Sequence, residues 1–267
     1  MKKTLLLLCM LFTIGLNAQI TDCSELFISE YIEGPGNNNA IEIYNPTNAT
    51  IDLSGYSINR YGNGATSGPD SWPLSGTITA GQAIAVGNGQ LDSVWVSTYW
   101  SLPVDPAFYS ACGQHGSGIY PTPFYFNGDD AMTLEKSGNI IDIFGKVGED
   151  PGGAWTDDAS AGYTDANGGT WWTKRQTLVR KASVMQGVTQ NPILFNPTLE
   201  YDSLPDATYT GMGSHTCDCS ATGVNEIDVS YVMYPNPVNS GGAVAVNSNT
   251  KVKSIVVINI LGEQIRF

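Results

Sequence analysis

The chain has 267 residues and a net charge of −13 at pH 7, from 25 acidic and 12 basic side chains. This acidity argues against a nucleic-acid partner, because an acidic surface repels a phosphate backbone. The basic residues that come nearest to forming a cluster are few: Lys174, Arg175, Arg180 and Lys181. The 30 glycines and 14 prolines, with only 14% charged residues, indicate short strands joined by many turns.

The beginning of the chain predicts a secretory signal peptide. Lys2 and Lys3 form a short basic start, residues 4–16 are almost wholly apolar, and the small Ala18 precedes the expected cut. The apolar run is too short to span a membrane, so we expect no transmembrane segment once residues 1–18 are removed. The mature chain then has 10 basic and 25 acidic residues, a net charge of −15 that keeps an exported protein soluble.

Residues 26–58 alternate between apolar and polar side chains, which predicts strands rather than helices. In the first strand the alternation places Leu26, Ile28 and Glu30 on one face. Residues 34–39 are rich in glycine, proline and asparagine and predict a turn before the next strand. The segment is therefore interpreted as an antiparallel β-meander in an all-β protein.

The same segment resembles the opening of a bacterial lamin-tail domain, an immunoglobulin-like β-sandwich. The second signature of that family, a turn followed by two strands, is similar to residues 127–134 and 138–145. The resemblance extends over about residues 25–214 and lies mainly in the order of the elements. It implies an immunoglobulin-like β-sandwich with long loops, which we place at residues 19–219, and a binding or scaffolding role without catalytic residues.

The end of the chain predicts a second, smaller unit. Residues 220–230 have the composition of a linker, and residues 231–267 contain Tyr-Pro-Asn-Pro-Val followed by two alternating runs. This pattern resembles the C-terminal sorting domain of the type IX secretion system, which implies passage across an outer membrane and release or attachment at the cell surface. The second half of that domain is missing, so we expect a partial, β-sandwich-like sorting tail and a sequence that continues beyond Phe267.

Four cysteines follow the signal peptide: Cys23, Cys112, Cys217 and Cys219. In an oxidising compartment an even number suggests two disulfides, with three possible pairings. A bridge between Cys217 and Cys219 would be strained, so each is expected to reach back to Cys23 or Cys112. The alternative is a zinc site from His215, Cys217 and Cys219, although the paired C-x2-C spacing of structural zinc sites is absent.

Ligand binding is expected at three tryptophans. Trp100 lies in a long irregular insertion at residues 90–124, and long loops on β scaffolds are where binding usually occurs. Trp171 and Trp172 are neighbours and cannot both face the core of a strand. One of them is available for a sugar or a protein partner, or else covers a neighbouring loop.

Acidic turns form a second candidate site. Calcium prefers several oxygen ligands from carboxylates and loop carbonyls. The candidate ligands are Glu149, Asp150, Asp157, Asp158 and Asp165. No EF-hand spacing is present, and the alternative is that these acidic turns are simply solvated.

The sequence offers little for catalysis. Only His115 and His215 could act as a base of the usual kind at neutral pH, and neither lies in a nuclease motif. Nucleophile elbows of the G-x-S-x-G form and phosphate-cradling loops are also absent. We therefore predict a non-catalytic, exported cell-surface module that binds a protein or polysaccharide and interacts with the type IX machinery. The alternatives are the accessory region of an exported hydrolase, a nuclease or phosphatase, or a calcium-stiffened adhesin.

Overall fold

The computed structural model describes residues 21–219, 231–235, 241–248, 257–258 and 264–265. Contacts divide the chain into two units, residues 1–220 and residues 221–267. The predicted signal peptide and linker lie outside the described residues. Within the described residues, no helix is both long enough and apolar enough to cross a membrane.

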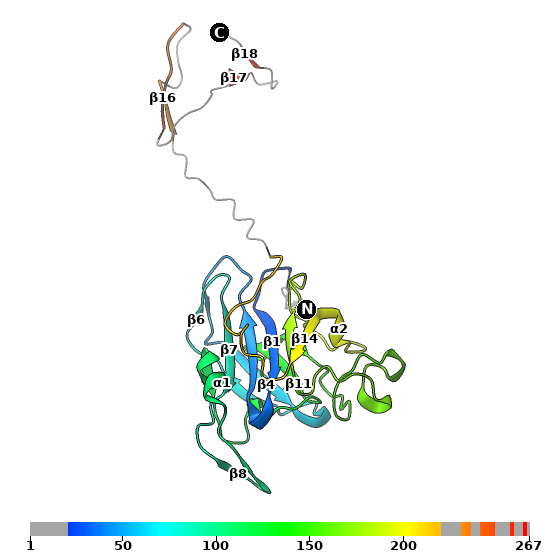
Figure 1. The fold of residues 1–267 in the computed structure, drawn as a ribbon. Helices are drawn as coiled ribbons and strands as arrows, with labels where there is room; N and C mark the ends of the chain where they lie inside the picture. Colours follow the sequence, from blue (N-terminus) through cyan, green and yellow to red (C-terminus); the bar gives the residue numbers. More distant parts are fainter. Residues whose placement is uncertain (1–20, 220–230, 236–240, 249–256, 259–263, 266–267) are drawn as a thin grey trace, which may run out of the picture. The chain divides into compact units, whose positions relative to one another are not determined.

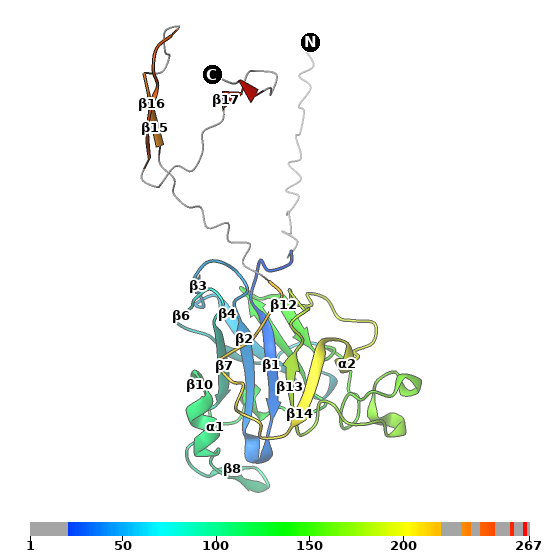
Figure 2. The same ribbon diagram turned by 45° about the horizontal axis from the view of Figure 1, so that its top comes forward.

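A six-stranded sheet forms one layer of the first unit (Figure 2). Its strands lie side by side in the order β10 (Gln114–Gly116), β7 (Ala83–Asn88), β2 (Asn39–Tyr44), β1 (Phe27–Glu33), β13 (Gln176–Arg180) and β14 (Tyr201–Pro205). All neighbours are antiparallel except β10 and β7, which are parallel.

A four-stranded antiparallel sheet forms the second layer. Its order is β12 (Asn139–Phe144), β11 (Ala131–Lys136), β4 (Tyr56–Tyr61) and β5 (Asp70–Pro73). Among the described residues of the first unit, two short strand pairs lie outside these sheets. β3 (Ile51–Asp52) pairs with β6 (Thr77–Ile78), and β8 (Val94–Val96) forms a hairpin with β9 (Tyr99–Ser101).

Helical segments are short. Among the described residues the α-helices are α1 (Pro106–Ala111) and α2 (Pro197–Glu200). The 3-10 turns are Pro35–Asn37, Gly62–Gly64, Pro123–Tyr125, Ala159–Ala161 and Asp165–Asn167.

The facing sides of the two sheets share one apolar core. Ile28 and Ile41 of the six-stranded sheet belong to the same buried cluster as Ile58 and Leu134 of the four-stranded sheet. Alternation along the strands directs these side chains inward, where apolar burial stabilises the fold. The all-β sandwich predicted from the sequence is therefore confirmed.

The predicted alternation of the first strand is wrong after Ile28. The register of β1 against β2 shifts between Ile28 and Glu30, as at a β-bulge. Tyr31 consequently joins the core and stacks on Phe144 at a centroid distance of 4.1 Å. Glu30 lies instead on the outer face, where its carboxylate faces Gly211.

Residues 206–219, which we call the strap, cover part of the outer face of the six-stranded sheet. Tyr209 and Met212 of the strap pack against the buried cluster that contains Ile32 of β1 and Phe108 of α1. Cys219, at the end of the strap, forms a disulfide with Cys23 just before β1. Part of the outer face of this sheet is therefore covered by the last segment of the first unit.

The expectation of two disulfides needs correction. Cys112 and Cys217 are free thiols in the structure. Cys112 is buried with Phe108 in one apolar cluster, whereas Cys217 packs against a different cluster around Phe27 and Tyr44. The fold therefore holds the two thiols in separate environments.

In the second unit the described residues form two strand pairs. β15 (Tyr231–Tyr234) pairs with β16 (Ala245–Ser248), and β17 (Val257–Ile258) pairs with β18 (Gln264–Ile265), both antiparallel. The predicted alternating runs of the tail lie only partly within these residues.

Candidate functional site

The β8–β9 hairpin exposes an aromatic surface. Trp95 and Trp100 are opposite each other in the pairing, with their rings edge to face at a centroid distance of 5.5 Å. They are 54% and 61% exposed, and Tyr99 and Leu102 beside them are also exposed. The hairpin projects beyond the sheets (Figure 1). Exposed apolar patches on soluble proteins commonly mark interaction sites.

One buried glutamine fixes the root of this hairpin. The Nε2 atom of Gln90 donates to the carbonyl oxygens of Ser101 and Leu102, each at 2.8 Å. Its Oε1 atom accepts hydrogen bonds from the hydroxyls of Ser101, at 3.0 Å, and Tyr125. The exposed aromatic rings are therefore carried on a base that is tied into the sandwich.

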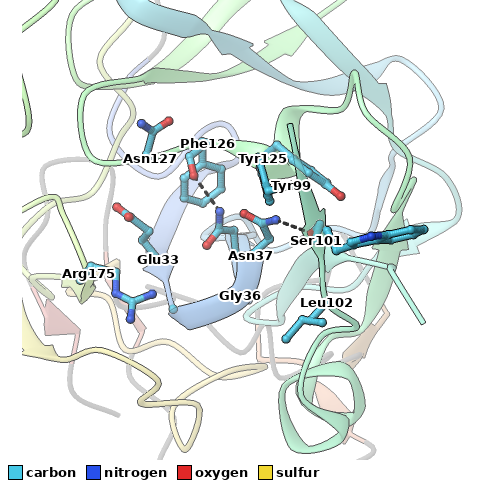
Figure 3. A pocket seen from close by; sticks show the side chains of 13 residues that line it. Glu33, Gly36, Asn37, Tyr99, Ser101, Leu102, Tyr125, Phe126, Asn127 and Arg175 are labelled. Carbon is cyan, nitrogen blue, oxygen red and sulfur yellow. Dashed lines mark hydrogen bonds between the residues drawn. The ribbon is translucent and has the colours of Figure 1, made fainter. Parts of the chain in front are cut away.

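A pocket of about 460 Å³ lies beside the hairpin (Figure 3). Its walls come from the turn between β1 and β2, from β9 and the residue after it, from residues 125–127, and from the residue just before β13. The lining residues are Glu33, Gly34, Gly36, Asn37, Asn39, Tyr99, Trp100, Ser101, Leu102, Tyr125, Phe126, Asn127 and Arg175. Figure 3 shows Glu33 and Arg175 on one side and Tyr99, Ser101 and Leu102 on the other.

Asparagines connect the walls of the pocket. Asn37 Nδ2 donates to Ser101 Oγ at 2.9 Å, which joins the β1–β2 turn to the hairpin. Asn39 Nδ2 donates to the carbonyl oxygen of Phe126 at 2.7 Å. Asn39 is only 2% exposed, and its Oδ1 has no hydrogen-bond partner in the structure. A buried acceptor left unsatisfied costs free energy, which the two hydrogen bonds of the Asn39 amide nitrogen offset.

Glu33 and Arg175 supply the charge of the pocket. Burial raises the pKa of Glu33 to about 7, although the backbone N–H of Arg175 and the Tyr31 hydroxyl, at 3.2 Å, favour its ionised form. Arg175 lies 3.5 Å from Asp206 through Nε, and its side chain is half exposed. The pocket thus combines a carboxyl group that is partly protonated at neutral pH with an accessible guanidinium.

The three predicted tryptophans do not form one site. Trp100 lines the pocket, but Trp171 and Trp172 do not. Trp171 is 44% exposed with Lys174 Nζ 4.4 Å from its ring centroid, whereas Trp172 packs against the main core. Sequence reasoning did not count Trp95 as a site residue, although the β-branched and aromatic run Val94-Trp95-Val96 favoured a strand there.

The predicted calcium ligands serve the turns of their own loop. Four aspartates accept hydrogen bonds from backbone N–H groups: Asp150 from Gly152, Asp157 from Thr170, Asp158 from Ser160, and Asp165 from Gly153. Glu149 pairs with Lys146 at 2.8 Å. Across the described ranges, no three His, Cys, Asp or Glu side chains gather where they could hold a metal ion.

The histidines are occupied by structural contacts. His115 stacks on Tyr109 at 3.7 Å, and its Nε2 lies 2.8 Å from the Tyr109 carbonyl oxygen. His215 contacts the rings of Phe27 and Tyr44, and burial lowers its pKa to about 4. The alternative zinc site is contradicted, because Cys219 forms a disulfide with Cys23 and therefore has no thiolate to bind zinc.

Comparison with known proteins gives one family match. Residues 19–148 match the family model of the Lamin Tail Domain, an immunoglobulin-like and non-enzymatic family. The matched segment runs through β12 and includes every pocket residue except Arg175. No curated protein matches the chain.

Proposed function

We propose that this chain, whose residues 19–148 match the Lamin Tail Domain, is an exported, non-catalytic binding module of the cell surface. In this proposal the sandwich is a scaffold, and the β8–β9 hairpin with its adjacent pocket contacts a protein or polysaccharide. The signal-peptide pattern of residues 1–18 and the resemblance of residues 231–267 to a sorting tail support export and surface display.

The paired Trp95 and Trp100 carry the proposal. Tryptophan is enriched among the residues that dominate binding energies, because a large rigid ring buries much area at little entropic cost. Both rings are exposed and stand on a hairpin held by Gln90. Such preorganisation reduces the entropy lost when a ligand binds.

The first prediction replaces both rings. A Trp95→Ala/Trp100→Ala variant should bind envelope polysaccharide or outer-membrane protein fractions at least about tenfold more weakly than the wild type, since each anchoring aromatic contributes about 2 kcal/mol. Binding of the labelled mature protein to immobilised fractions measures this.

Trp171→Ala is the matched control, because Trp171 is exposed but lies outside the pocket lining. Its binding should equal that of the wild type, and thermal melts should show all variants folded. Unchanged binding by the double variant would contradict the proposed surface.

A further inference from the structure

We infer that the pocket beside the β8–β9 hairpin binds one sugar residue of a neutral glycan. This inference rests on the binding role proposed above and names its ligand class. It depends on three features of the pocket. These are hydrogen-bond donors and acceptors that have no partner, an exposed tryptophan beside them, and a lining without net positive charge.

Free donors and acceptors meet at this pocket. The side-chain amide of exposed Asn127 and the Oδ1 atom of Asn37 make no hydrogen bond with other described residues. The terminal N–H groups of Arg175 are likewise free of hydrogen bonds within the described part of the chain. Each sugar hydroxyl both donates and accepts, so a set that mixes amides with a guanidinium and a carboxyl can satisfy several hydroxyls at once.

Aromatic rings flank these polar groups. Trp100 and Tyr99 line the pocket and are about half exposed or more. A flat ring packs well on the C–H face of a pyranose, whose hydroxyls then point sideways to polar partners. Ligand sites in general combine such apolar surface with a few placed polar groups, and 460 Å³ is within their usual range of about 300–1,000 Å³.

Charge favours a neutral glycan over an acidic one. The guanidinium of Arg175 is offset by the carboxylate of Asp206, 3.5 Å from its Nε, and in part by the carboxyl of Glu33, so the pocket carries no net positive charge that would favour an anion. The chain as a whole carries −13 and repels polyanions.

The test titrates the mature protein with cellotriose, maltotriose, mannotriose and chitotriose, and with trigalacturonate as the acidic comparison. We expect at least one neutral trisaccharide to bind and trigalacturonate not to bind, as measured by calorimetry up to millimolar concentration. Asn127→Ala and Trp100→Ala should each weaken the binding at least about tenfold. Both side chains are exposed, so these variants should fold, and Trp171→Ala should bind like the wild type.

The outcomes separate this inference from the proposed function. If no neutral trisaccharide binds but an outer-membrane protein binds in a Trp100-dependent manner, the glycan inference fails and the binding role stands. If neither binds, both fail. Binding of a trisaccharide that is unaffected by Asn127→Ala and Trp100→Ala, or equal binding of trigalacturonate, would also overturn the inference.

Discussion

Glu30 and Glu42 occupy facing positions on β1 and β2, beneath the strap. Burial, with a further contribution from the charge of Glu42, raises the pKa of Glu30 to about 8. Burial also raises the pKa of Glu42 to about 7, opposed by hydrogen bonds from the Ser29 hydroxyl at 2.7 Å and the Gly213 N–H at 2.6 Å. Glu30 therefore holds its proton at neutral pH, which keeps two negative charges from meeting in a buried place.

The pH dependence of stability follows from this raised pKa. Between the ordinary value of 4.5 and about 8, the folded protein retains a proton on Glu30 that the unfolded chain has lost. The free energy of unfolding should therefore fall as the pH rises through this window, by up to about 1.4 kcal/mol per pH unit from this group. A Glu30→Gln variant should lose most of that decline and exceed the wild type in stability at pH 8, as urea unfolding at several pH values would measure.

The matched control for Glu30→Gln is Asp92→Asn, which changes an exposed carboxylate. Its pH profile should follow that of the wild type. The other buried carboxyls remain in both proteins, so only the difference between profiles is informative. If the profile of Glu30→Gln ran parallel to that of the wild type across pH 5–8, the protonated state assigned to Glu30 would be wrong.

At the scale of elements, a buried ion pair joins the two sheets. Arg180 of β13 pairs with Asp142 of β12, and Arg180 Nη1 also donates to the Ile28 carbonyl oxygen of β1 at 3.1 Å. Asp142 in turn accepts the N–H groups of Ile28 at 2.7 Å and Val188 at 2.8 Å. These hydrogen bonds offset the cost of removing both charges from water. The pair thereby links one sheet to the other.

Replacing Arg180 should therefore be severe. Arg180→Met leaves the fully buried Asp142 without its cation, and breaking such a pair costs about 3–5 kcal/mol. Arg175→Met removes an exposed partner of Asp206 and should cost less than about 1 kcal/mol. Urea unfolding of the two variants measures both changes. Equal losses of stability would contradict the structural role given to the buried pair.

The sequence predicted which segments form strands better than it predicted the register in which those strands pair. Alternation identified β1 and β2, and the resemblance to the family's second signature identified the β11–β12 hairpin, because each pattern is local. Alternation failed at the bulge after Ile28, because a register shift depends on the partner strand and leaves no mark in the alternation itself.

The candidate site was harder to predict for a related reason. Trp100 was identified from its place in a long loop, but Glu33, Asn127 and Arg175 were not, since the pocket brings them together from distant parts of the chain. The order of the strands and the path of the loops decide which residues meet in the pocket, and no local sequence pattern carries that information. The free thiols of Cys112 and Cys217 were missed in the same way, because the course of the strap decides which cysteines meet.

At the scale of the whole molecule, the Cys23–Cys219 disulfide closes almost all of the first unit. It links positions 196 residues apart, from just before β1 to the end of the strap. Cross-linking so long a loop restricts the unfolded chain, which typically adds about 2–4 kcal/mol to stability. Because the bond forms readily only in an oxidising compartment, the full stability of the sandwich depends on oxidising conditions.

Export and oxidation should therefore occur together. Protein recovered from outside the cytoplasm should begin at Gln19, after the predicted cut, and should contain Cys23 bonded to Cys219 with Cys112 and Cys217 free. The same chain expressed in the cytoplasm without residues 1–18 should be reduced and less stable by about 2–4 kcal/mol, because its unfolded state is no longer cross-linked. Intact mass, a non-reducing peptide map and urea unfolding measure these properties. A Cys23→Ser variant should show the same lower stability from either compartment. An exported protein that retains residues 1–18, or a reduced protein of equal stability, would contradict this dependence.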